Sequence, residues 1–125
     1  MANIFIKGVT LDGSVTNIKI EGNRFTEIGC DITSSLEDVV IDGADKAIVP
    51  PFYNAHTHAA MTLLRGYADD MPLFPWLNDY IWPFEAKMTE EDIYIGSRLA
   101  LLEMIKSGTL FFNDMYWDTH ETWRA

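Results

Sequence analysis

The sequence predicts an α/β fold, and two contrasting segments carry this prediction. Residues 3 to about 49 hold short apolar runs that alternate with polar residues and are separated by turn signals, as in a small β unit. From Ala47 the order changes to strand, long loop, helix and strand, which is typical of a parallel βαβ unit. The chain has 125 residues, of which 48% are hydrophobic, so it can build a core.

The charge of the chain excludes some classes of function. The formal net charge is −10, and the nine Lys and Arg residues form no basic patch, so we expect no nucleic-acid partner. The start of the sequence lacks the pattern of a signal peptide, and no apolar run approaches the roughly 18 residues of a membrane span. A single cysteine, Cys30, cannot form an intramolecular disulfide, which favours the cytoplasm.

The first segment carries no residues with catalytic spacing. Alternation is clearest at residues 18–20 and 39–41, which predicts strands there. Residues 21–24 and 42–45 contain Gly with Asn or Asp, and we expect both to form hairpin connections. The segment is therefore expected to be a structural sheet.

Two histidines mark the start of the second segment. The apolar run 47–49 and the turn-like residues 50–54 lead into His56 and His58, which we place on one strand. Side chains two apart on a strand point to the same side, so both imidazoles can bind one metal ion. A catalytic zinc site usually has three protein ligands, so the pair is half of a site.

Two further residues are weaker candidates for this site. Asp114 lies near the end of the second strand and could reach the site, but we favour a role in orienting a neighbouring backbone. His120 is the only other histidine and lies among polar residues beyond that strand, so we expect it on the surface.

The stretch from Ala59 to Met88 is expected to be a long irregular loop. Three prolines interrupt it, although residues 76–82 could form a short helical segment between two of them. A loop of this length is uncommon unless it is functional, so it is a candidate lid. Arg65 is expected to form no more than a surface ion pair with Asp69 and Asp70.

A helix is predicted over residues 90–106. Thr89 can cap its start, three acidic residues favour its first turn, and Gly108 follows its end. Apolar residues recur at helical spacing along it, namely Ile95, Leu99, Leu102 and Ile105. A second apolar strand is expected over residues 109–116.

The last residues, 121–125, look like the opening turn of another helix without a stop signal. We therefore expect the chain to be part of a larger fold. A complete parallel barrel takes roughly 250 residues, so about its first quarter would be present here.

Several separated motifs resemble one family. Residues 48–58, IVPPFYNAHTH, resemble the first-strand signature of the amidohydrolase superfamily. Residues 59–70, Trp76, residues 81–85 and residues 114–116 are similar to its branch of 5′-methylthioadenosine/S-adenosylhomocysteine deaminases and chlorohydrolases. The likeness covers the whole chain. Pro51 departs from the glycine that is usual in the family and affects only the local turn.

The resemblance implies a (β/α)₈ metallo-hydrolase barrel, incomplete in this chain, with an N-terminal β-sandwich portion. Residues 1–49 would belong to the sandwich and residues 50–125 to the barrel. It implies that His56 and His58 bind one divalent metal ion, zinc being expected and iron the alternative. It also implies that Trp76 and Glu85 contact the substrate. The later metal ligands and the catalytic residues of the family have no counterpart here, so no catalytic residue is assigned.

The function implied is hydrolytic deamination of adenosine-type nucleosides, with this chain inactive by itself. One alternative keeps the fold and changes the substrate, as in guanine deaminases or triazine chlorohydrolases. Another alternative is a non-catalytic folding or assembly module. The expected partners are a small-molecule substrate and either a second copy of the chain or the remainder of the fold, because an open barrel piece exposes strand edges.

Overall fold

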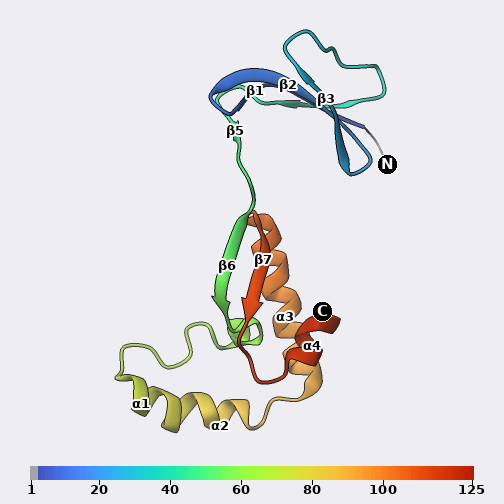
Figure 1. Ribbon diagram of the computed structural model, residues 1–125. Coiled ribbons are helices and arrows are strands. Elements are labelled where there is room, and N and C mark those ends of the chain that lie inside the picture. The colour runs from blue at the N-terminus through green and yellow to red at the C-terminus, as the bar shows by residue number, and fades with distance from the viewer. Residues whose placement is uncertain (1–2) are drawn as a thin grey trace. The chain divides into compact units, whose positions relative to one another are not determined.

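The computed structural model describes residues 3–125, which form two compact units, one ending at Pro50 and one running from Pro51 to Ala125 (Figure 1). The first unit is one mixed sheet with the strand order β3-β2-β1-β4, in which β5 also pairs with β1. Its strands are β1 (Ile4–Leu11), β2 (Ser14–Glu21), β3 (Arg24–Gly29), β4 (Val39–Asp42) and β5 (Ala47–Ile48).

Only one of the two expected hairpin connections is present. The turn after Glu21 joins β2 to the antiparallel β3, as predicted. Residues 42–45 instead join β4 to β5, and both of these strands run parallel to β1. Gly43 is needed there for a close approach, because a Cβ at this position would lie 2.7 Å from the Cβ of Val9. The sequence signal of a turn was therefore correct, but its interpretation as a hairpin was wrong.

The core of the first unit is small. Its buried apolar residues are Phe5 and Val9 of β1 and Ile18 of β2. Several other apolar side chains of this unit are exposed, including Val15, Phe25, Ile28, Val39, Val40 and Ile41. The described residues that line the candidate site belong to the second unit.

The second unit contains the predicted βαβ order. Strands β6 (Phe52–Thr57) and β7 (Thr109–Asp114) pair in parallel and lie side by side, and α3 (Glu90–Lys106) connects them (Figure 1). The expected single strand from Ala47 to the histidines is wrong, since Ala47 and Ile48 pair with β1 in the other sheet. Pro50 and Pro51 explain the break, because proline has no N–H to continue a ladder.

Much of the predicted loop is helical. A 3₁₀ helix covers Ala59–Leu64, and one continuous helical stretch is formed by α1 (Leu73–Trp76), a π-helical turn (Leu77–Ile81) and α2 (Trp82–Glu85). The helical segment expected at residues 76–82 is thus confirmed and is longer than predicted. Pro75 lies in the first turn, where its missing N–H costs nothing, and the wider π turn precedes Pro83.

Helix α3 begins and ends where the sequence predicted. The Thr89 hydroxyl accepts from the Asp92 N–H, and the Asp92 carboxylate accepts from the Thr89 N–H, which makes a complete capping box. The buried face is formed by the small or compact residues Ile93, Gly96, Ser97 and Ala100. The apolar residues at helical spacing lie on the opposite, exposed face: Ile95, Leu99, Leu102 and Ile105.

The buried face of α3 packs on the 3₁₀ helix. A Cβ at Gly96 would lie 2.6 Å from the carbonyl oxygen of Ala60, so only glycine allows this approach. Ser97 also hydrogen bonds Thr122 of α4 (Thr119–Arg124), with 3.2 Å between the two hydroxyl oxygens. These contacts bring the residues that follow His58 against the helix.

Two further findings concern the surface. The ion pair expected between Arg65 and Asp69 or Asp70 is wrong. Arg65 instead makes a bidentate contact with Glu103 of α3, with N–O distances of 3.0 and 2.7 Å. This pairing lowers the pKa of the Glu103 carboxyl. Among the described residues, no helix has both the length and the apolar character that crossing a bilayer requires.

Candidate functional site

The two histidines meet at the end of β6. His56 lies on the strand, and His58 lies just beyond it, where it precedes the 3₁₀ helix. Their Nε2 atoms are 3.2 Å apart, and both side chains are exposed. The Asn54 side chain supports this end of the strand, since it accepts from the His56 N–H at 3.2 Å and donates to Thr57.

Asp114 fixes the backbone beside His58. Its Oδ1 accepts a hydrogen bond from the Ala59 N–H at 3.1 Å, which ties the end of β7 to the end of β6. Its Oδ2 is buried and has no hydrogen-bond partner among the described residues. The expected backbone-orienting role of Asp114 is therefore confirmed.

The spacing of the histidine nitrogens fits a metal ion. Two nitrogen ligands at zinc distance in a tetrahedral arrangement lie about 3.3 Å apart. The observed separation of 3.2 Å agrees with two neighbouring ligands of one ion. Across residues 3–125 no group of three His, Cys, Asp or Glu side chains could surround a metal, so the pair could supply two ligands but does not complete a centre.

A cavity of about 410 Å³ lies beside His58. It is lined by the other two residues that the sequence analysis selected, Trp76 and Glu85, and both are partly buried. The π-helical turn supplies Leu77 and Ile81 to the remaining wall, and Trp82 follows from α2. Tyr116 and Trp117 close the wall from beyond β7. The structure thus brings His58, Trp76 and Glu85 to one cavity of the size expected for a small-molecule site.

Tyr116 connects the parts of this cavity. Its hydroxyl donates to Glu85 Oε1 at 2.8 Å and lies 3.6 Å from the sulfur of Met88. Its ring meets the ring of His58 edge to face, with 6.3 Å between centroids. Burial and then the hydrogen bond to Glu85 raise the pKa of the Tyr116 phenol well above its ordinary value. The phenol therefore keeps its proton and acts as a donor.

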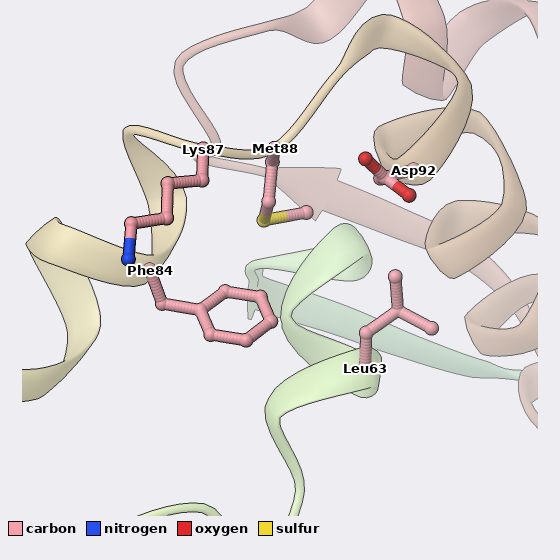
Figure 2. A pocket seen from close by; sticks show the side chains of 5 residues that line it. All are labelled: Leu63, Phe84, Lys87, Met88 and Asp92. Atoms are coloured by element: carbon pink, nitrogen blue, oxygen red, sulfur yellow. The ribbon is translucent and has the colours of Figure 1, made fainter.

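A second cavity of about 160 Å³ is lined by other residues: Leu63, Phe84, Lys87, Met88 and Asp92 (Figure 2). Met88 points into the space between Phe84 and Leu63, while Lys87 and Asp92 lie at its edges (Figure 2). The polar groups do not converge on a point in this cavity. We regard it as a packing gap.

The sequence analysis missed Tyr116 as a member of the site. The motif at residues 114–116 was noted, but only the neighbouring Asp114 was considered for a role. A tyrosine two residues beyond an aspartate at a strand end was the available signal, because strand ends gather active-site residues in parallel α/β folds. His120 is exposed, as predicted, and lies outside the cavity beside His58.

Curated relatives match almost the whole chain. It is 58% identical over 100 residues to a 5-methylthioadenosine/S-adenosylhomocysteine deaminase of Archaeoglobus fulgidus, which covers 80% of this chain and 23% of the relative. It is 47% identical over 133 aligned positions, covering the full chain, to a 5′-deoxyadenosine deaminase of Methanococcoides burtonii, of which it spans 30%. The chain thus spans less than a third of the length of these relatives.

Solved structures share the fold. An adenosine deaminase of Xanthomonas campestris with bound zinc has a TM-score of 0.75 and 28% identity, over 97% of this chain and 30% of that one. Atrazine chlorohydrolase of Arthrobacter aurescens has a TM-score of 0.73 at 21% identity, over 97% of this chain and 32% of its own, and shows likeness of fold alone. The amidohydrolase family pattern matches residues 47–124, more than half of the chain, and the chain therefore belongs to the amidohydrolase family.

Proposed function

We propose that this chain is part of a metal-dependent hydrolase that deaminates adenosine-type nucleosides. The observation that carries the proposal is the shared cavity of His58, Trp76 and Glu85, which joins a metal-binding imidazole to two groups suited to a nucleoside. Relatives with 47–58% identity are named as deaminases of 5-methylthioadenosine, S-adenosylhomocysteine and 5′-deoxyadenosine, which supports this substrate class.

In this proposal His56 and His58 bind a divalent ion, with zinc as the first candidate and iron as the alternative. Imidazole nitrogens suit zinc, and the zinc-containing adenosine deaminase of related fold supports the choice. When bound, the ion supplies a Lewis acid that lowers the pKa of water towards about 7. Asp114 holds the backbone after His58 in place, so the two imidazoles stay directed to one point.

The cavity wall binds the nucleoside. Trp76 offers an aromatic face to the base or to an apolar 5′ substituent. Glu85 accepts hydrogen bonds from the ribose hydroxyls, and its partly buried position strengthens these bonds. The apolar residues around both groups offer contact area to the apolar parts of the substrate.

We also propose the architecture of the complete protein. The β6–α3–β7 unit would begin a (β/α)₈ barrel, with residues 50–125 in the barrel and residues 1–49 in a β-sandwich portion. The exposed apolar side chains of β4 and α3 support burial against further chain or a second copy. The single exposed cysteine, Cys30, supports a reducing compartment such as the cytoplasm.

The test uses the full-length protein with zinc. We expect conversion of adenine to hypoxanthine absorbance with 5′-methylthioadenosine, S-adenosylhomocysteine or 5′-deoxyadenosine. Absence of turnover with every adenosine-type nucleoside would overturn the assignment. Guanine and atrazine are the comparison substrates for the alternative amidohydrolase activities.

The variant Glu85→Gln separates these alternatives further. With a nucleoside substrate its KM should rise, because the amide binds the ribose hydroxyls less strongly than the carboxylate does. With guanine or a triazine, which lack ribose, the KM should not change. Zinc analysis of the purified protein addresses the non-catalytic alternative, since a folding module should bind no metal and should be indifferent to His56→Ala.

A further inference from the structure

We infer that Tyr116 is a positioning residue that sets the ribose specificity of the pocket by fixing the Glu85 carboxylate. The inference rests on the proposed function and adds a residue to it. It starts from one hydrogen bond, in which the Tyr116 hydroxyl donates to Glu85 Oε1 at 2.8 Å.

Burial makes this hydrogen bond obligatory. Tyr116 is only 5% exposed, so its hydroxyl has little access to water. The other acceptor within reach is the sulfur of Met88 at 3.6 Å, and thioether sulfur is a weak acceptor. If Glu85 turned away, the phenol would lose its strong partner, and a buried donor without a partner is costly. Tyr116 therefore holds Glu85 in one orientation.

The bond uses only one carboxylate oxygen. Among the described residues, Glu85 Oε2 makes no hydrogen bond. It is also accessible, since the buried side-chain oxygens without a partner belong to Asp38 and Asp114. Glu85 lines the cavity, so this second oxygen is available to a ligand there. The arrangement presents one fixed acceptor to a donor such as a ribose hydroxyl.

The same tyrosine also contacts the metal-binding end. Its ring lies edge to face on His58, with an angle of 82° between the planes. One side chain thereby fixes the position of the carboxylate relative to the imidazole. A substrate that is held by Glu85 would reach the metal at a set distance, which is the geometric requirement for an efficient reaction.

The experiment compares Tyr116→Phe with wild type in the full-length zinc enzyme. Phenylalanine keeps the ring contact with His58 and removes only the hydroxyl. We expect KM for a 5′-deoxyadenosine substrate to rise about tenfold, which is typical for loss of a hydrogen bond to a charged group, with a smaller change in kcat. The 2′,3′-dideoxy analogue of the same nucleoside has no ribose hydroxyls for Glu85 to bind. For this analogue, the variant and the wild-type enzyme should have similar KM values.

The double variant Glu85→Gln/Tyr116→Phe gives the sharper readout. If Tyr116 acts through Glu85, the double variant should have the same KM as Glu85→Gln alone, because the two changes share one effect. A purely structural role would instead raise KM equally for both nucleosides and add to the effect of Glu85→Gln. Tyr80→Phe, a tyrosine that does not line the cavity, is the matched control.

The outcomes separate the two proposals. Failure of the wild-type enzyme to turn over or bind any adenosine-type nucleoside overturns the proposed function and this inference together. If the wild-type enzyme turns over the nucleoside, two results overturn only the role of Tyr116. One is an unchanged KM in Tyr116→Phe, and the other is an equal rise in KM for the nucleoside and its 2′,3′-dideoxy analogue. Thermal unfolding checks that each variant is folded, and Glu85→Gln probes the same bond from its other partner.

Discussion

The proposed metal-binding end, His56 and His58, and the wall of the cavity lie next to each other but differ in how they are supported. His56 and His58 are exposed, contact each other through their ring nitrogens, and find no third ligand within residues 3–125. The wall around Glu85 is tied internally, through Tyr116 and Met88. One part of the site is thus half assembled, while the other is already formed.

This difference suggests that substrate binding and the chemical reaction depend on different parts of the site. The groups that would recognise a nucleoside come from one helical stretch and from the residue two positions after β7. The groups that would react with it need a metal ion with at least one more ligand. We therefore expect changes at the metal-binding end to abolish turnover, and changes at the wall to alter which substrate is accepted.

The largest effect is expected for His58→Ala in the full-length protein. Loss of a metal ligand should weaken zinc binding by more than the roughly 100-fold that loss of a supporting partner costs. Nucleoside binding at the wall should persist, and titration calorimetry with metal analysis measures both. His120→Ala is the control, because that side chain is exposed and should leave the zinc content unchanged. Full zinc content in His58→Ala would remove the basis for the comparison.

A smaller effect is expected for Gly96→Ala, beneath the 3₁₀ helix that follows His58. The new methyl group would lie 2.6 Å from the Ala60 carbonyl oxygen, so the helices must separate. Overpacking of this kind costs about 1–3 kcal/mol of unfolding free energy, which urea denaturation measures. Gly29→Ala is the matched control, since its added Cβ would meet only Ile32 at 4.0 Å. Equal stability of the two variants would contradict the close contact.

The smallest effect is expected at the capping box of α3, which follows Met88, the residue whose sulfur contacts the Tyr116 hydroxyl. Thr89→Ala should cost about 1 kcal/mol, because one backbone N–H loses its acceptor. The hydrogen bonds from Thr89 also lower the pKa of the Asp92 carboxyl below its ordinary value of 3.8. The folded state therefore favours the carboxylate, and this stabilisation is present above about pH 4 and lost as the pH falls further.

Urea denaturation across this pH range tests the capping box. The acid-induced loss of stability should be smaller in Thr89→Ala than in wild type. Ser107→Ala at the other end of α3 is the control, because the Ser107 hydroxyl donates to a carbonyl and caps no free N–H. If the unfolding free energy of Thr89→Ala and of wild type fell by the same amount as the pH is lowered, the role of the capping box would be contradicted.

The sequence predicted those parts of the structure that depend on local chemistry. The bounds of α3 followed from Thr89 and Gly108. The convergence of His56 and His58 was also predicted, although His58 lies just beyond the strand on which both were placed. The helical stretch at residues 73–85 was underestimated, because a π turn ahead of Pro83 is a local adjustment that proline counts do not reveal. Capping and alternation act within a few residues, which is why they are visible in one sequence.

The features that the sequence did not predict depend on partners that are distant in the chain. Nothing near Arg65 indicates Glu103, which lies 38 residues away in sequence. The pairing of Glu85 with Tyr116 spans 31 residues and was missed for the same reason. The buried face of α3 was also not predictable, because Gly96 and Ala100 are selected by the close approach of the 3₁₀ helix rather than by hydrophobicity.

The parallel pairing of β6 with β7 has a consequence for the order of folding. His58 and Tyr116 come together only after the whole crossover between β6 and β7 has closed. Closing a loop of this length lowers the entropy of the chain before the stabilising contacts form. The capping box and the helical stretch can form earlier, because their contacts are local. We expect the cavity to be among the last features to appear during refolding, so the tyrosine environment at residue 116 should report the final kinetic phase.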